Sequence, residues 1–232
     1  MGVPFYVSPE QQTQDKADFA RKGIARGKPI CALDFADGIV MIAENRSGSL
    51  RKLGEVYDRI AFAGVGKFDE YESLRKQGVR FADLRGYSYS REDVTASSLA
   101  TAYSESLGHH FAQPYSKPLE VELLLCEVGE RQNAYFQVMF DGTVRDQTRY
   151  ACIGGSSGDL ESVLSADWKP DLSLGDAVGL GRRALSRGAD GSSSLSHASL
   201  EIVLLDRRRS GRKFRRLDAS QIARLEESGS VD

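Results

Sequence analysis

Apolar residues form two kinds of segment along the chain, and the two kinds come in separate blocks. Short apolar runs bounded by turn residues predict strands, and apolar residues at three- and four-residue spacing predict helices. The predicted strands comprise residues 30–35, 39–43, 59–66, 120–128, 134–140, 149–154, 200–206 and 213–217. The predicted helices comprise residues 8–22, 68–77, 91–112, 158–165 and 173–187, with a last short helix capped by Asp218 and Gln221.

Local signals place several ends of these segments. The turn residues Ala36-Asp37-Gly38 between two apolar runs predict a β-hairpin. Ser8 is a good N-cap, Pro9 suits the first helical position, and Gln11 completes a capping box. Gly78 marks the expected end of the second helix. The first helix has a thin apolar stripe, so we expect it to lie on the surface or to pack on something other than its own domain.

The order of the segments predicts the fold class. Strands, helices, further strands, further helices and a final strand pair follow one another in blocks, which is typical of an α+β fold rather than of alternating βαβ units. Two antiparallel sheets with helices on both outer faces fit this order. A Gly/Ser-rich stretch at 188–196 predicts a mobile loop, and no linker is long enough to divide the chain.

Charge is distributed unevenly. The 232 residues carry 31 basic and 33 acidic side chains, a net charge of −2, which excludes a globally basic nucleic-acid coat. Residues 207–216 hold seven basic residues and no acidic one, so the remaining 222 residues carry 24 basic against 33 acidic side chains, a net of −9. The basic run is interpreted either as a contact for phosphate or for an acidic partner, or as a solvated hairpin whose arginines point outward; the second interpretation is favoured.

The residues alone predict no catalytic constellation. Cys31, Cys126 and Cys152 lie in apolar runs without metal-binding spacing, which indicates small buried hydrophobes in a reducing compartment. The three histidines lack ligand spacing, and the chain has no GxSxG, HExxH or phosphate-binding loop. The sequence therefore predicts no metal and no cofactor. It also shows no secretory signal and no apolar run long enough for a membrane span, so a cytoplasmic location without membrane association is expected.

Several long motifs resemble one family. They are FARKGIARG at 19–27, SLRKLGEVYDRIAFAGVGKF at 49–68, FADLRGYSY at 81–89 and KPLEVEL at 117–123. Together with the hairpin at 30–45, they resemble the alpha-type subunits of the 20S proteasome core particle in their actinobacterial form, within the threonine-peptidase family of proteasome subunits. The resemblance extends over nearly the whole chain up to about residue 206.

The resemblance implies the four-layer αββα sandwich of N-terminal nucleophile hydrolases, with an additional N-terminal helix. In beta-type relatives the catalytic threonine stands just before the first hairpin strand, a position that falls near Lys28 here. No Thr, Ser or Cys is present there, and 27 residues precede it. Lys52 falls where beta-type chains carry their catalytic lysine, and Glu44 where they carry an acid. The resemblance therefore implies a noncatalytic subunit, since this mechanism needs both a nucleophile and a free α-amino group.

The resemblance also implies two functional regions. The lysine at the position of Lys52 receives the C-terminal carboxylate of ring-shaped activators, in a pocket between neighbouring subunits that Gly27 and Lys67 help to line. The segment before the first helix corresponds to the gate of the axial pore. The gate residues are Val3, Pro4, Phe5, Tyr6, Val7 and Ser8, and they lack the Tyr-Asp-Arg triplet of archaeal and eukaryotic relatives.

These implications predict the domains and the partners. Residues 1–27 form the gate segment and helix, residues 28–227 the sandwich, and residues 228–232 a short tail. The expected partners are beta subunits, other alpha subunits in a heptameric ring, the tails of a hexameric AAA ATPase, and substrate polypeptides, which are pupylated proteins in the family; no nucleic acid is expected. Two alternatives stay open: a processed hydrolase with Cys31 as its N-terminal nucleophile, and a nucleic-acid-binding module using residues 207–216.

Overall fold

The computed structural model describes residues 8–188 and 199–228. The helices are α1 (Pro9–Ala25), α2 (Phe68–Ser88), the 3₁₀ turn η1 (Arg91–Asp93), α3 (Ala96–Ala112), α4 (Ser157–Asp167), α5 (Leu174–Gly188) and α6 (Ala219–Ser228). The strands are β1 (Ile30–Phe35), β2 (Gly38–Glu44), β3 (Leu53–Tyr57), β4 (Ile60–Gly66), β5 (Val121–Glu127), β6 (Ala134–Val138), β7 (Val144–Gln147), β8 (Tyr150–Ile153), β9 (Leu200–Asp206) and β10 (Phe214–Arg216).

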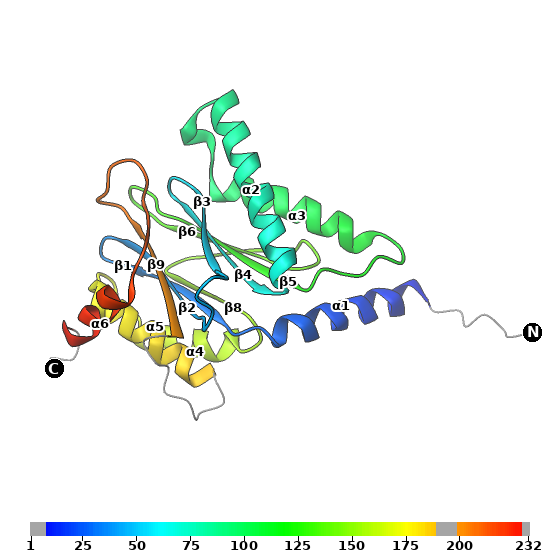
Figure 1. Cartoon of the computed structure of the whole chain (residues 1–232). Coiled ribbons are helices and arrows are strands. Elements are labelled where there is room, and N and C mark those ends of the chain that lie inside the picture. Colours follow the sequence, from blue (N-terminus) through cyan, green and yellow to red (C-terminus); the bar gives the residue numbers. More distant parts are fainter. Residues whose placement is uncertain (1–7, 189–198, 229–232) are drawn as a thin grey trace, which may run out of the picture.

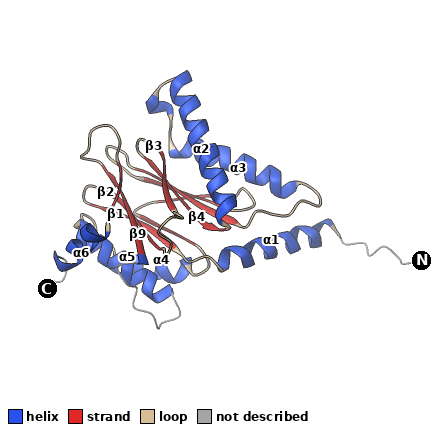
Figure 2. Cartoon of the chain, in the orientation of Figure 1, coloured by secondary structure: helices blue, strands red, loops and turns tan. Residues whose placement is uncertain are grey.

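The strands form two antiparallel five-stranded sheets that face each other between layers of helices (Figure 2). One sheet has the order β10-β9-β2-β1-β8 and carries α4 and α5 on its outer face; the other has the order β3-β4-β5-β6-β7 and carries α2 and α3 (Figure 1). The predicted hairpin is present, with Ile30 paired to Ala43 and Phe35 to Gly38. The predicted αββα sandwich is confirmed.

Three apolar clusters hold the four layers together. The central cluster lies between the sheets and includes Met41, Leu124 and Tyr135. The other two lie beneath α4 and α5 and beneath α2 and α3. Strand β2 is buried along its whole length because the helices cover one of its faces and the second sheet covers the other. Such strands are continuous apolar runs, which is why the sequence revealed them.

Helix α1 begins where its capping residues predict and extends three residues further than expected, to Ala25. The Ser8 hydroxyl accepts a hydrogen bond from the Gln11 main chain, but the Gln11 side chain donates to Asp15, so the predicted capping box is only half formed. Ala17, Ala20 and Ile24 pack against the end of the central cluster. The rest of the helix runs outward from the sandwich (Figure 1), in agreement with its thin apolar stripe.

Helix α2 does not end at Gly78, contrary to the sequence-based expectation, and continues for ten further residues to Ser88. Gly78 lies where α2 crosses α3, and a Cβ atom placed on it would lie 1.9 Å from the hydroxyl oxygen of Tyr103. The glycine therefore permits close helix packing rather than marking a helix end.

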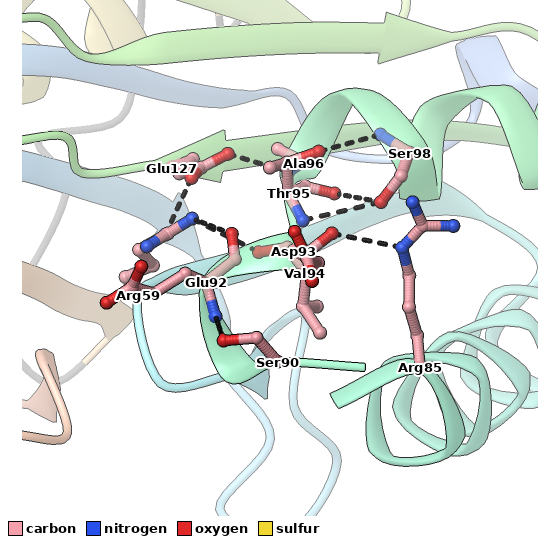
Figure 3. A network of polar contacts seen from close by, with 10 residues as sticks. All are labelled: Arg59, Arg85, Ser90, Glu92, Asp93, Val94, Thr95, Ala96, Ser98 and Glu127. Atoms are coloured by element: carbon pink, nitrogen blue, oxygen red, sulfur yellow. Dashed lines mark hydrogen bonds and ion pairs between the residues drawn. The ribbon is translucent and has the colours of Figure 1, made fainter. Parts of the chain in front are cut away.

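Helix α3 begins at Ala96, five residues later than predicted, because Thr95 and Ser98 form a reciprocal capping box there. The preceding residues form η1, which is attached to the sheet by polar contacts (Figure 3). Arg59 donates to Glu127 at 2.7 Å and to the Glu92 carbonyl at 3.0 Å, while Glu127 also accepts from the Ala96 main chain at 2.7 Å.

Two strands were not predicted, and both lie at edges of the same sheet. Strand β3 has only two buried residues, Leu53 and Val56, and β7 has none. Edge strands bury less apolar surface than central ones, so their sequence pattern is weak. The remaining predicted segments are present with small shifts at their ends, including the caps by Ser173 and Asp218. Most of the predicted 188–196 loop lies outside the described residues.

Candidate functional site

At one end of the sandwich the structure brings together three charged residues that lie far apart in the sequence. Lys28 precedes β1, Glu44 ends β2, and Lys52 precedes β3. The Lys28 ammonium lies 3.5 Å from the Glu44 carboxylate, and the Lys52 ammonium lies 3.4 Å from the Lys28 carbonyl oxygen. Glu44 is only 5% exposed and also pairs with Arg46 at 3.2 Å. The structure thus brings together the acid and the lysine that the resemblance relates to the beta-type pattern, beside a lysine close to the position it implies for the nucleophile.

Lys52 is a half-buried cation. Burial lowers the pKa of its ammonium from the ordinary value, and Lys28 acts in the same direction, whereas the carboxylates of Glu44 and Glu201 raise this pKa. A partly desolvated ammonium beside an open groove attracts an anion more strongly than one in bulk water, because the local dielectric constant is lower. The arrangement is therefore suited to binding a carboxylate.

Gly27 and Lys67 lie at the end of β4, close to the Lys52 segment. A Cβ atom on Gly27 would lie 2.5 Å from a methyl carbon of Val65, so a side chain cannot be accommodated there without movement. Lys52 lies across from Gly64, whose N–H donates to the Lys52 carbonyl at 3.2 Å. Lys67 follows three residues later, as the N-cap residue directly before α2. The backbone thus brings the three predicted pocket residues to one end of the β3–β4 pair.

The Lys67 side chain is exposed and faces acidic residues of α2. Its ammonium lies 3.2 Å from Asp69 and 3.5 Å from Glu70. The hydrogen bond and charge of Asp69 raise the pKa of this ammonium. Lys67 is consequently an ion-paired cation at the margin of the site, whereas Lys52 is the half-buried one.

Sequence reasoning missed Glu201, which lies in β9 among apolar neighbours. Its carboxylate is buried and accepts hydrogen bonds from the main chain of Lys52 at 3.1 Å and from Leu53 at 3.3 Å. The Asn45 side chain donates to it at 2.6 Å, and Arg216 forms an ion pair with it. A charged residue inside the apolar run LEIVLLD was the available signal, because a buried charge requires partners.

Most arginines of the basic run are exposed, as the favoured interpretation of a solvated hairpin expects, and several of them also form ion pairs or hydrogen bonds at the surface. Arg212 forms an ion pair with Glu55, and Arg208 pairs with Asp37 at 2.8 Å. Arg207 donates to the Gly129 carbonyl at 2.8 Å. These contacts attach the β9–β10 hairpin to the body of the protein, so they do not favour the nucleic-acid alternative.

A groove of about 910 Å³ follows strand β3 between α2 and the β9–β10 hairpin, and Lys52 is part of its wall. Two arginines reach the outer edge of β3 from opposite sides of this groove. Arg216 donates to the Leu53 carbonyl at 2.7 Å, and Arg75 donates to the Glu55 carbonyl at 3.2 Å.

The alternative nucleophile Cys31 is enclosed in the fold. It lies within β1, is fully buried, and burial raises the pKa of its thiol to about 12. A catalytic cysteine needs a lowered pKa and access to substrate, so Cys31 lacks both properties. Within residues 8–188 and 199–228, no group of three or more His, Cys, Asp or Glu side chains is arranged to hold a metal ion.

Two further observations concern the termini and membranes. Of the predicted gate residues, Ser8 caps α1, while Val3 to Val7 lie outside the described residues.

Among the helices in the described part of the chain, none combines the length and the apolar character that crossing a bilayer requires.

Comparison with known proteins identifies the family. The family model described as "Proteasome subunit" matches residues 24–204. The chain belongs to the proteasome subunit family. It is 49% identical to the proteasome subunit alpha of Renibacterium salmoninarum over 96% of this chain and 94% of that protein. The corresponding protein of Paenarthrobacter aurescens is 48% identical over 97% and 98%, and that of Streptomyces coelicolor 44% identical over 100% and 92%.

These relatives confirm the prediction of a noncatalytic alpha-type proteasome subunit from the actinobacterial branch. Membership in this family implies assembly with beta subunits and with other alpha subunits. The absence of a nucleophile at Lys28 agrees with the noncatalytic assignment.

Proposed function

We propose that this alpha subunit forms heptameric outer rings on the beta rings, controls access of substrates to the proteolytic chamber, and binds the C-terminal tails of a hexameric AAA ATPase. Residues 1–27 act as gate and pore-side helix, the substrates are pupylated proteins, and the complex works in the cytoplasm. The observation that carries the proposal is the half-buried Lys52 ammonium at the open end of the β3–β4 pair.

The chemistry of Lys52 supports tail binding. A chain ending in a free carboxylate presents two charged oxygens, and a lysine ammonium offers up to three donors to them. The Lys52 ammonium has one described hydrogen bond, to the Lys28 carbonyl, and this contact is long at 3.4 Å. Donor capacity therefore remains for an incoming carboxylate. Gly27 lets the end of α1 pack closely against Val65 of β4, which brings the α1–β1 connection next to the Lys52 segment.

Exposed apolar side chains support assembly with other chains. Leu84 is 68% exposed and Tyr87 is 92% exposed at the C-terminal end of α2, which projects from the body of the subunit (Figure 1). Tyr89, directly after this helix, is 77% exposed. Neighbouring exposed apolar residues of this size are characteristic of interaction surfaces.

The decisive experiment replaces Lys52 by alanine in particles assembled from alpha and beta chains. Hydrolysis of a fluorogenic peptide is measured with and without a synthetic peptide copied from the C-terminus of the host's ring ATPase. We expect the concentration for half-maximal stimulation to rise roughly 10- to 100-fold, because a hydrogen bond to a charged group is lost.

Two controls make this result specific. Lys169→Ala removes an exposed lysine in the connection between α4 and α5 and should leave stimulation unchanged. The second control is the same tail peptide with a C-terminal amide, which lacks the carboxylate. On wild-type particles it should stimulate as weakly as the carboxylate peptide does on Lys52→Ala particles, because each change removes one partner of the same contact. Equal stimulation of wild type and Lys52→Ala would refute the tail-binding function.

A further inference from the structure

The segment that carries Lys52 crosses from one sheet to the other. Strand β2 ends in the first sheet, β3 begins in the second, and residues 45–52 connect them. Internal hydrogen bonds fold this connection. Asn45 donates to the Leu50 carbonyl at 2.8 Å and accepts from the Ser47 main chain at 2.9 Å, and Leu50 donates to the Ser47 hydroxyl at 2.9 Å. The connection thus has a defined shape before it reaches Lys52.

The carboxylate of Glu201, on strand β9 of the first sheet, bonds both ends of this connection. Asn45 at its start and the main chain of Lys52 at its end bond to the same oxygen atom, Oε2, while Leu53 and Arg216 donate to Oε1. Arg216 also bonds the Leu53 carbonyl at 2.7 Å. The Glu201 side chain is 2% exposed, so water does not compete for these donors.

We propose that Glu201 is the positioning residue for Lys52, an inference that rests on the tail-binding function proposed above. By accepting the main-chain N–H of Lys52, Glu201 determines where the side chain starts and therefore where its ammonium lies. Arg216 supplies the counter-charge of Glu201, which leaves the Lys52 ammonium available to a carboxylate from outside. Neutralising Lys52 and displacing it should then have similar consequences for tail binding.

The bonding pattern makes Glu201→Gln an informative change. Among the described residues, the groups that bond Glu201 are all donors: an amide, two main-chain N–H groups and a guanidinium. Glutamine has nearly the same shape but replaces one acceptor oxygen by an NH₂ group, which then faces other donors. We expect the tail peptide to bind about tenfold more weakly, which corresponds to about 1.4 kcal/mol.

The experiment measures fluorescence anisotropy of the labelled ATPase tail peptide on assembled particles, with the free carboxylate and with the amide. Glu201→Gln should weaken binding of the carboxylate peptide and leave the amide peptide unaffected. In a Lys52→Ala background the same change should have no further effect, whereas a general structural defect would weaken binding in both backgrounds. Asp34→Asn is the matched control, because it alters another carboxylate with several hydrogen bonds, at the opposite end of β1.

The outcomes separate the two proposals. If Lys52→Ala weakens binding of the carboxylate peptide but Glu201→Gln does not, the positioning role is wrong and tail binding stands. The same conclusion follows if Glu201→Gln weakens binding equally in the wild-type and the Lys52→Ala backgrounds. If Lys52→Ala itself binds the carboxylate peptide like wild type, tail binding is wrong. Should Glu201→Gln not assemble, Asn45→Ala removes one donor from the same carboxylate at a less buried residue, and unchanged affinity in that variant would contradict the positioning role.

Discussion

Replacing Gly78 by alanine tests the packing of α2 against α3. In an unobstructed helix interior this change stabilises a protein by about 0.8–1.0 kcal/mol, because alanine loses less backbone entropy than glycine. In α2 the added methyl group would lie 1.9 Å from the Tyr103 hydroxyl oxygen and 2.8 Å from the adjacent ring carbon. The ring has to move, and the sign of the effect depends on what that movement costs.

Tyr103 is poorly able to move. Its ring is 4% exposed, packs on Phe62 at a centroid distance of 6.1 Å, and its hydroxyl donates to the Leu74 carbonyl at 3.0 Å. Overpacking a core costs about 1–3 kcal/mol, and breaking a buried hydrogen bond costs about 1–3 kcal/mol more. After subtraction of the gain in helix propensity, Gly78→Ala should lower the free energy of unfolding by about 1–5 kcal/mol.

Urea unfolding of the purified chain, followed by circular dichroism, gives this free energy. Tyr103→Phe removes the atom in closest contact, so Gly78→Ala should cost less in that background, with a coupling of about 1 kcal/mol or more. Gly179→Ala is the matched control, since Gly179 lies in the middle of α5 with its nearest neighbouring atom 3.8 Å away, and this change should stabilise. Stabilisation by Gly78→Ala, or strict additivity with Tyr103→Phe, would refute the packing argument.

Three further predictions concern buried groups. Arg216→Ala should lower the free energy of unfolding by about 3 kcal/mol, because the buried Glu201 loses its counter-ion. The control Arg209→Ala, at an exposed residue, should change it by less than about 0.5 kcal/mol. Equal effects of the two changes in urea titrations would contradict the role of Arg216 as counter-ion. Burial raises the pKa of the Cys31 thiol to about 12 and that of the other two cysteines as well, so none should react with Ellman's reagent at pH 8 until urea unfolds the chain; rapid labelling of native protein would argue against their enclosure. Burial also raises the pKa of Asp34 above its ordinary value of 3.8, so the folded state keeps this proton to a higher pH than the unfolded state does. The free energy of unfolding of wild type, relative to that of Asp34→Asn, should therefore fall as pH rises from the unfolded pKa of Asp34 through its folded pKa. A pH-independent difference between the two proteins would contradict the raised pKa.

The comparison of sequence with structure shows which signals are local. Ser8 with Pro9, and the turn at residues 36–38, act through neighbours a few positions away, so the start of α1 and the first hairpin could be predicted. Gly78 was misread because a glycine at a helix end and a glycine at a helix crossing look alike in sequence. Its partner Tyr103 is 25 positions away, and only the folded chain brings the two residues together.

The candidate site likewise contains residues that the sequence pointed to and a residue that only long-range contacts reveal. Lys52, Gly27 and Lys67 were selected by resemblance, and the structure places them near one another without testing what they bind. Glu201 was missed because its partners Asn45 and Lys52 lie about 150 positions earlier in the chain, and only the pairing of β2 with β9 and the crossing to β3 bring them to it. A buried carboxylate has no periodic pattern of its own, since its environment is made entirely by long-range contacts.

The two arginines at β3 bear on the subunit before it joins a ring. An edge strand exposes a row of unpaired backbone groups, which invites pairing with an edge of another chain and hence aggregation. The Leu53 and Glu55 carbonyls point off the free edge of β3, and Arg216 and Arg75 already occupy them. A newly made subunit therefore carries its own protection against backbone pairing along this strand.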